Sequence, residues 1–169
     1  MNMRKVGLTI LAVLMITWGS PAQMQNYYPV FIYNFTRYIQ WPASSQNGDF
    51  VIGVLGDCDI VPKLQKMTTT KKVGSQSIKL KVFNSVNEIG DCHMIFIPEK
   101  KSDKLGSVNS KIKGSATLVV TEKEGLAKAG SAINFIVQDG KLKFELNKGV
   151  AESANLKVSG DLSKLAIII

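Results

Sequence analysis

Few residues in this sequence could do chemistry. The chain has one histidine, His93, and two cysteines, Cys58 and Cys92, which excludes a zinc site built from several of either. Cys92 and His93 are neighbours within an apolar run typical of a strand, where successive side chains point to opposite faces. The two therefore cannot meet as a nucleophile and its base, and we expect His93 to be structural.

Carboxylates at strand ends are the remaining candidates for a binding site. Asp57, Glu99 and Glu122 each follow an apolar run typical of a buried strand. The carboxyl ends of parallel strands form the usual ligand-binding edge of an open α/β sheet, so these three residues are candidates for a generic ligand site. Asp57 and Asp59 have a plainer interpretation, because the N-terminus of a helix stabilises negative charge without any ligand.

No motif for catalysis or nucleotide binding accompanies these carboxylates. Gly53 and Gly56 frame the end of the first predicted strand, but a dinucleotide fingerprint needs a third glycine, and Asp57 puts negative charge where a phosphate would sit. The sequence contains neither a P-loop lysine motif nor a G-x-S-x-G elbow. We therefore expect no catalytic residue, no metal, no cofactor and no enzymatic activity.

The first 22 residues read as a secretory signal peptide. Arg4 and Lys5 give a positive start, and the apolar run over residues 6–18 is too short to span a bilayer as a helix, which needs about 20 residues. Ser20 and Ala22 supply the small residues of a cleavage site. We expect a protein exported to a bacterial periplasm, with an uncleaved anchor helix as the alternative.

Composition and charge describe an ordinary globular chain. Of the 169 residues, 45% are hydrophobic and 20% are charged, which excludes a disordered chain or a collagen, and the net charge is +8. Arg37 is the only arginine after the signal peptide. Because nucleic-acid readers favour arginine, we expect no nucleic-acid partner and interpret the scattered lysines as a solvated surface. Weak attraction to anionic lipid or an acidic partner is the alternative.

The two cysteines leave an alternative open. An exported protein meets oxidising conditions, and closing this loop would stabilise the fold by about 3–4 kcal/mol on the chain-entropy account. The geometry argues against the bond, because Cys58 follows one predicted parallel strand and Cys92 begins another, which places them toward opposite ends of the sheet. A disulfide between Cys58 and Cys92 and a pair of buried thiols are both possible at this point.

Periodicity predicts alternating helices and strands. Aromatic residues spaced by three and four predict a first helix over 23–41, which Pro42 ends. Asp139-Gly140 between two apolar runs predicts an antiparallel hairpin. The predicted strands cover residues 50–55, 78–83, 92–97, 116–121, 132–137 and 142–146, and the other predicted helices cover 59–67, 86–89, 101–112, 124–129 and 148–154.

This order of elements predicts an α/β fold. We expect a single domain over residues 23–169, with a mostly parallel sheet, helices on both faces and a C-terminal antiparallel hairpin at one edge.

Residues 31–42, FIYNFTRYIQWP, carry a resemblance to a known family. They resemble the aromatic helix that opens the YfiR family of bacterial periplasmic proteins, and later segments match that family in the same order. These segments are residues 51–56, 92–97, 121–130, 133–135 and 142–147.

The resemblance implies a regulator. Proteins of this family are exported, and the best-known type binds the periplasmic domain of an inner-membrane diguanylate cyclase and holds it inactive until redox or envelope stress relieves the inhibition. Dimers are usual. The family often has a cysteine inside the first strand, where this chain has Gly53, so the family's disulfide does not carry over directly.

The aromatic motif has two interpretations. Its side chains either anchor the first helix to the sheet or form a partly exposed face for a partner or a second protomer, since tyrosine and tryptophan are enriched in such contacts. The motif residues are Tyr33, Asn34, Phe35, Tyr38, Trp41 and Pro42.

The leading functional hypothesis is a periplasmic regulator that inhibits a membrane-bound signalling protein, a cyclase or a sensor kinase, by contact with its periplasmic domain. A homodimer is expected. A periplasmic small-molecule binding protein is the alternative, and an enzyme built on Asp57 and Glu122 is the weakest hypothesis.

Overall fold

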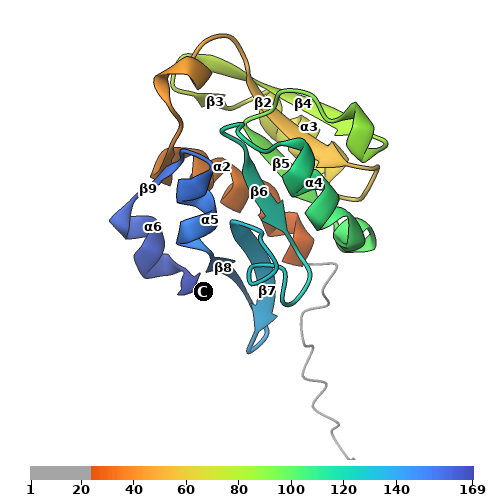
Figure 1. The fold of residues 1–169 in the computed structure, drawn as a ribbon, viewed down its shortest axis with the longest axis vertical. Helices are drawn as coiled ribbons and strands as arrows, with labels where there is room; N and C mark the ends of the chain where they lie inside the picture. Colours follow the sequence, from red (N-terminus) through yellow and green to blue (C-terminus); the bar gives the residue numbers. More distant parts are fainter. Residues whose placement is uncertain (1–23) are drawn as a thin grey trace, which may run out of the picture.

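The computed structural model describes residues 24–169, which fold around an eight-stranded sheet of order β10-β8-β7-β6-β5-β2-β4-β3 (Figure 1). The predicted signal peptide lies outside the described residues. Strands β4, β2, β5, β6 and β7 are parallel to one another, and the β7–β8 hairpin is antiparallel. The strands are β2 (Phe50–Leu55), β3 (Lys72–Val73), β4 (Gln76–Phe83), β5 (Met94–Ile97), β6 (Leu118–Thr121), β7 (Ile133–Gln138), β8 (Lys141–Leu146) and β10 (Ile167–Ile168).

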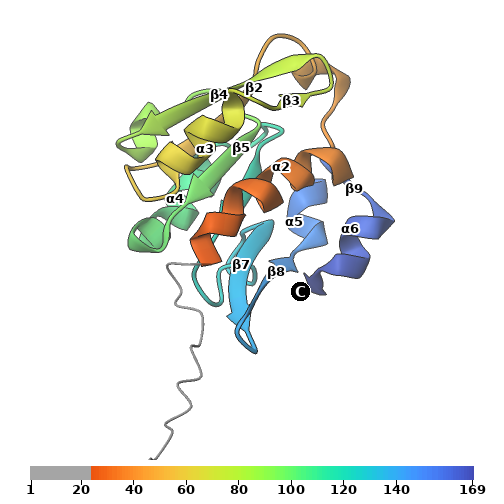
Figure 2. The same ribbon diagram turned by 180° about the vertical axis from the view of Figure 1, so that it is seen from behind.

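Helices cover both faces of this sheet, as Figures 1 and 2 show from opposite sides. The predicted fold class, a single-domain α/β protein with a mostly parallel sheet and a C-terminal hairpin, is confirmed. The helices are α2 (Tyr28–Tyr38), α3 (Val61–Thr68), α4 (Leu105–Lys111), α5 (Lys148–Ser153) and α6 (Gly160–Leu165), and the 3-10 turns are η1 (Gln25–Tyr27), η2 (Ala43–Ser45), η3 (Val86–Glu88) and η4 (Glu99–Lys104).

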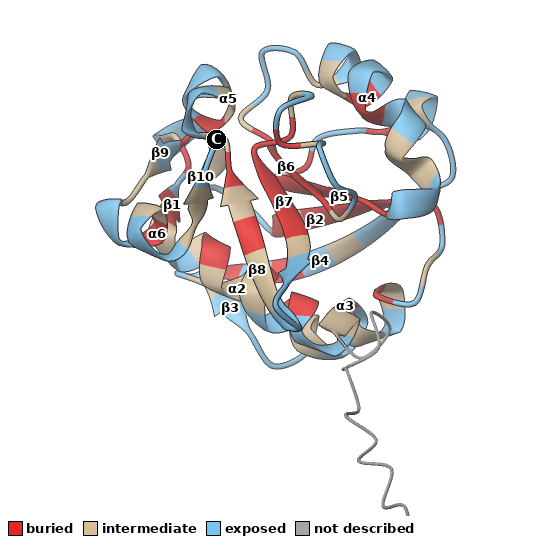
Figure 3. Cartoon of the chain, turned by 90° about the horizontal axis from the view of Figure 1, so that it is seen from below, coloured by how far each residue is buried: buried red, intermediate tan, exposed pale blue. Residues whose placement is uncertain are grey.

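The sheet separates two apolar cores. On one face, buried residues of α2, α3, α5 and α6 pack against alternate residues of the strands. On the other face, Leu105 and Val108 of α4 pack against Ile95, Ile97 and neighbouring residues. Figure 3 shows this buried interior running along the central strands. Because side chains alternate along a strand, one continuous apolar run such as residues 94–97 supplies both cores.

The first helix is shorter than predicted. It ends at Tyr38, and Ile39–Gln40 form the short strand β1, which pairs antiparallel with β9 (Lys157–Val158). Pro42 explains only part of this early end, because a proline restricts mainly the residue before it. Pairing with β9, which is distant in the sequence, fixes the extended backbone from Ile39 onward.

Three further predictions need correction. Residues 124–129 form turns rather than a helix, and residues 99–104 form a 3-10 turn ahead of α4. The hairpin is not the edge of the sheet, because β10 pairs in parallel with β8 beyond it. The C-terminal segment contains both a helix, α6, and a strand, β10.

Candidate functional site

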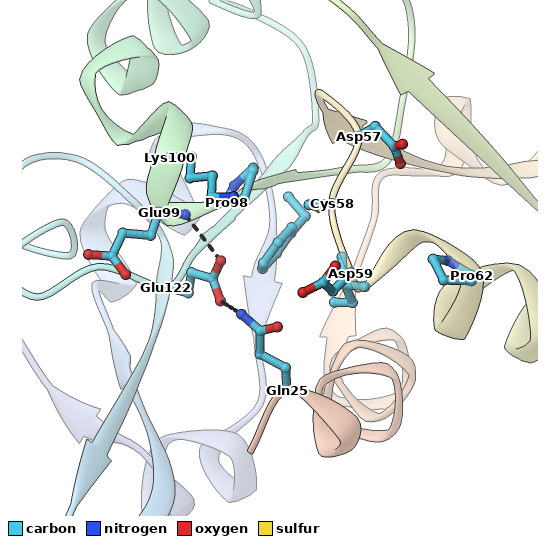
Figure 4. Close-up of a pocket in the computed structure, with 11 residues that line it drawn as sticks. Gln25, Asp57, Cys58, Asp59, Pro62, Pro98, Glu99, Lys100 and Glu122 are labelled. Atoms are coloured by element: carbon cyan, nitrogen blue, oxygen red, sulfur yellow. Dashed lines mark hydrogen bonds between the residues drawn. The ribbon is translucent and has the colours of Figure 1, made fainter. Parts of the chain in front are cut away.

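A pocket lies where β2, β5 and β6 end. These strands are parallel, so their carboxyl ends meet at one edge, and the segments that follow them line a cavity of about 450 Å³ (Figure 4). The three predicted candidates, Asp57, Glu99 and Glu122, all line this cavity. The other lining residues are Gln25, Cys58, Asp59, Ile60, Pro62, Phe96, Pro98 and Lys100.

Glu122 is the best-connected carboxylate of the pocket. One of its oxygens accepts a hydrogen bond from the Glu99 backbone N–H at 3.1 Å, and the other accepts from Gln25 Nε2 at 3.0 Å (Figure 4). Burial, and next the Glu122 charge, raise the pKa of the Tyr28 phenol well above its ordinary value. Glu122 is therefore held in place by β5, β6 and the N-terminal segment together.

The opposite wall of the pocket comes from the segment between β2 and α3. Asp57 and Asp59 are exposed there, and Cys58 between them is half-buried. Both aspartates lie before the N-terminus of α3, but neither caps it, because the N-cap is Ile60 and no side chain makes a capping hydrogen bond. The pocket thus carries four carboxylates against one ammonium group, that of Lys100.

Of the two alternatives for the cysteines, the structure has the pair of thiols, since Cys58 and Cys92 are both free. Strands β2 and β5 run parallel with Ile52 opposite Met94, which sets Cys92 level with the start of β2, whereas Cys58 follows its end. The length of β2 alone separates these levels by roughly 16 Å at about 3.3 Å per residue, well beyond disulfide reach. Burial raises the pKa of both thiols, that of Cys92 to about 12.

The aromatic motif packs onto the sheet rather than outward. Phe35 and Trp41 are buried, and Tyr33 and Tyr38 are half-buried against the same core. The Phe35 ring contacts Phe144 edge-on, with their centroids 5.2 Å apart. Of the other motif residues, Asn34 and Pro42 are half-buried as well.

Trp41 and His93 attach the C-terminal end of the aromatic motif to the sheet. Trp41 Nε1 donates to the His93 carbonyl at 3.1 Å, and the His93 ring stacks on Phe50 with centroids 4.4 Å apart. His93 Nδ1 accepts the Val51 backbone N–H at 3.0 Å, so the ring proton lies on Nε2, which faces the Ser45 carbonyl at 2.6 Å. These contacts give His93 the structural role that the sequence predicted.

The exposed apolar residues near the aromatic motif are ones that sequence reasoning missed. Tyr27 precedes α2, Val30 lies in its first turn, and each is 58% exposed. Both residues lie within the segment whose aromatic spacing predicts a helix. That spacing indicates which face of the helix packs on the core, but it does not indicate which neighbouring apolar residues remain exposed. Gln25 was missed as a pocket residue for a related reason, because its contact with Glu122 joins segments far apart in the sequence.

A buried polar row crosses β6, β7 and β8. Thr121 Oγ1 donates to Asn134 Oδ1 at 2.7 Å, and Asn134 Nδ2 donates to Glu145 Oε2 at 2.8 Å. Thr121 and Asn134 are both fully buried. The row fixes the register of the hairpin against the parallel part of the sheet, close to the strand end that carries Glu122.

Two further properties concern metals and membranes. Within residues 24–169, no three histidine, cysteine or acidic side chains are grouped so that they could hold a metal ion. Among the same residues, no helix combines the length and apolar character that a bilayer span requires.

The fold and the pocket define a single-domain α/β protein with a polar site at the carboxyl edge of its sheet. The YfiR/HmsC-like family matches residues 27–167, and the chain belongs to this family. It is a family of periplasmic regulatory proteins. No curated protein matches the chain.

Among solved structures, the chain is similar to the ABC domain from Streptococcus pneumonia in complex with L-Trp, with a TM-score of 0.54 and 12% sequence identity. The similarity covers 71% of this chain and 55% of that one, so the chain spans about half the length of the structure it matches. At this identity the similarity concerns the fold alone.

Proposed function

We propose that this protein binds the periplasmic domain of an inner-membrane signalling protein, a diguanylate cyclase or a sensor kinase, and holds it inactive. Membership of a family of periplasmic regulators supports the proposal. The observation that carries it is the pair of exposed apolar side chains, Tyr27 and Val30, on the segment that bears the aromatic motif. The exported form is expected to begin near residue 23 and to be a homodimer.

The surface around these two residues has the character of a contact site. Phe31, one turn from Tyr27, is half-buried and lies over the hairpin, with its ring centroid 5.9 Å from that of Phe135. Val137, two residues beyond Phe135 on the same side of β7, is 48% exposed. Tyrosine beside aliphatic residues supplies large contact area at low entropic cost. We call Tyr27, Val30, Phe31 and Val137 the α2–hairpin face.

Membrane capture tests this proposal. The exported protein, immobilised, should retain from detergent-solubilised inner membranes a protein with a cyclase or kinase domain. The double variant Tyr27→Glu, Val30→Glu should retain at least tenfold less of it. Val82→Glu is the matched control, because Val82 is a 38% exposed valine on β4, outside the α2–hairpin face, and capture should be unchanged. Failure of the unmodified protein to capture any cyclase or kinase would overturn the proposal.

A small-molecule binding protein is the second candidate, and the pocket at the carboxyl edge favours it. Its four carboxylates share the lining with the apolar residues Phe96 and Ile60, so a bound molecule would combine a positive charge with an apolar body. Native mass spectrometry of protein purified from periplasm tests this directly. A retained cation that is lost in Glu122→Gln and kept in Glu152→Gln, an exposed control on α5, would support it, and its absence from unmodified protein would count against it.

A further inference from the structure

The excess positive charge of the folded chain is concentrated in one stretch of sequence. Residues 60–87 contain six lysines and no acidic residue, whereas the rest of residues 24–169 contains thirteen basic and thirteen acidic residues. The lysines therefore look scattered along the sequence, but the charge that remains unbalanced is local. The six residues are Lys63, Lys66, Lys71, Lys72, Lys79 and Lys81.

This stretch forms one edge of the molecule. It comprises α3, β3 and β4, and β4 and β3 are the last two strands on their side of the sheet (Figures 1 and 2). Lys72 is paired with Ser77 across these strands, so Lys72, Lys79 and Lys81 lie on the same face. These three lysines and Lys71 are all exposed. We call Lys71, Lys72, Lys79 and Lys81 the basic edge.

Helix α2 adds a further cation beside the basic edge. Arg37 and the β3–β4 turn, residues 73–76, line a common cavity to which no carboxylate contributes. Lys71 Nζ lies 5.3 Å from the centroid of the Tyr33 ring, one helical turn before Arg37. The only arginine after the predicted signal peptide is therefore close to the same edge.

The basic edge is not neutralised by the chain itself. The ion pairs found among residues 24–169 all join residues outside 60–87. Asp49 and Asp91 line a cavity with Lys81, but they precede the inner strands β2 and β5 and do not form an ion pair with it. Exposed charges act over about 8–10 Å at moderate salt, so the basic edge attracts anions from its surroundings.

We propose that the basic edge binds the phosphate headgroups of an anionic phospholipid bilayer. Because Lys72 is opposite Ser77, the row of ammonium groups from Lys72 to Lys81 follows about 13 Å of strand at about 3.3 Å per residue. Such a row suits an extended array of phosphates, whereas a single small anion needs groups that converge on one point. Each lysine near an anionic bilayer strengthens binding roughly fivefold.

The residue types favour a lipid surface over an acidic protein. Protein interfaces are enriched in aromatic residues, methionine and arginine and depleted in lysine. On α3, β3 and β4, the one large apolar side chain that is exposed is Val82, at 38%. Lysine ammonium groups are point charges that attract phosphate without a fixed geometry, as contact with mobile headgroups requires.

Lipid binding through this edge leaves the proposed protein contact free. The basic edge lies on β3 and β4, whereas the α2–hairpin face adjoins β7, on the other side of the central strands. The inference goes beyond the proposed function and does not depend on it, since a lipid vesicle contains neither a cyclase nor a kinase.

Co-sedimentation of the exported protein with vesicles tests the proposal. Phosphatidylcholine vesicles with about one-third phosphatidylglycerol should bind the protein, those of phosphatidylcholine alone should bind it at least tenfold more weakly, and added salt should release it. The double variant Lys79→Gln, Lys81→Gln should bind at least tenfold more weakly. Lys111→Gln, Lys113→Gln is the matched control, because it removes the same charge from exposed lysines at the end of α4 and should weaken binding less than threefold.

Three results would overturn the assignment: no binding to the anionic vesicles, equal weakening by the two double variants, or displacement by inorganic phosphate beyond that by chloride at equal ionic strength. The last result would indicate a site for one phosphate group. An acidic protein as the occupant would also overturn it, and would appear as loss of membrane capture by Lys79→Gln, Lys81→Gln with vesicle binding unchanged. Both lysines are exposed and unpaired, so this variant should melt at the temperature of the original protein.

Discussion

Gly53 offers the sharpest test of how tightly this sheet is packed. It lies in the middle of β2, between β4 and β5, at the position where the resemblance places a family cysteine. A Cβ at this position would come within 2.8 Å of Phe83 Cε2 and 2.9 Å of Ile95 Cδ1. Both neighbours are buried, so neither can swing into solvent. The Phe83 ring therefore occupies the space that a side chain at residue 53 would need.

The expected effect of Gly53→Ala follows from two opposing terms. Non-bonded carbons prefer separations of about 3.5–4.0 Å, and overpacking a core typically costs about 1–3 kcal/mol. Replacing a strand glycine by alanine returns about 0.5–1 kcal/mol of backbone entropy. We expect a net loss of about 1–2 kcal/mol, which corresponds to a melting temperature lower by about 2–8 °C for a domain of this size.

Urea denaturation followed by the fluorescence of buried Trp41 measures this loss. Phe83→Leu should relieve the overlap, so the double variant Gly53→Ala, Phe83→Leu should lose at least about 1 kcal/mol less than the sum of the single variants. Gly106→Ala is the matched control, because nothing lies within 4 Å of its Cβ position, and it should stabilise α4 slightly. A Gly53→Ala protein as stable as the original, or strictly additive variants, would refute the packing argument.

Four further predictions concern buried polar groups and thiols. Native protein at pH 8 should react slowly with a thiol reagent at Cys58 and far more slowly at Cys92, because burial raises the pKa of Cys92 to about 12. After unfolding without reductant, mass spectrometry of the labelled protein should show two free thiols. The pKa of Cys92 is higher in the folded than in the unfolded protein, so the thiol deprotonates first in the unfolded state as the pH rises. The free energy of unfolding should therefore keep the full Cys92 contribution below the unfolded-state pKa of about 8.5 and lose it progressively above that pH. Urea titrations at pH 7.5 and 9.5 measure the difference. Asn134→Asp should place a second carboxylate beside that of Glu145, which Asn134 Nδ2 now contacts at 2.8 Å. Thermal melts should show a greater loss of stability at pH 8 than at pH 4, because the two carboxylates repel each other when both are ionised. Equal losses of stability at the two pH values would contradict the contact. Trp41→Phe should remove the hydrogen bond to the His93 carbonyl and lower stability by about 1 kcal/mol in urea, and an unchanged midpoint would show that this bond is not a net contributor.

The central strands could be predicted from the sequence because their pattern is local. The apolar, β-branched run at residues 50–55 is the whole of β2, and the Asp139-Gly140 turn fixes the β7–β8 hairpin. The two-residue strands β1, β3, β9 and β10 could not be predicted. A strand that short has no periodicity, and only its tertiary partner defines it.

Some residues of the candidate site could also be predicted from the sequence, whereas others depend on tertiary contacts. Asp57, Glu99 and Glu122 could be placed on one edge because parallel strands bring their carboxyl ends together, whatever the details of packing. Gln25 could not be placed there, since the path of the N-terminal segment across the sheet depends on many aromatic contacts. The α2–hairpin face was missed because the helical pattern of the first helix does not indicate how far the hairpin extends beneath it.

The separation of the two thiols bears on how this protein is controlled. Resemblance to the YfiR family implies that redox stress relieves inhibition, but Cys58 and Cys92 lie at opposite ends of parallel strands and pack against different cores. Joining them would require β2 and β5 to slip past each other by most of their length, which would break the sheet. A disulfide switch within one chain is therefore not available to this fold. We propose that control comes instead from binding and release at the surface, where Tyr27 and Val30 of the α2–hairpin face and the C-terminal residues Leu165 and Ile168 leave apolar side chains exposed.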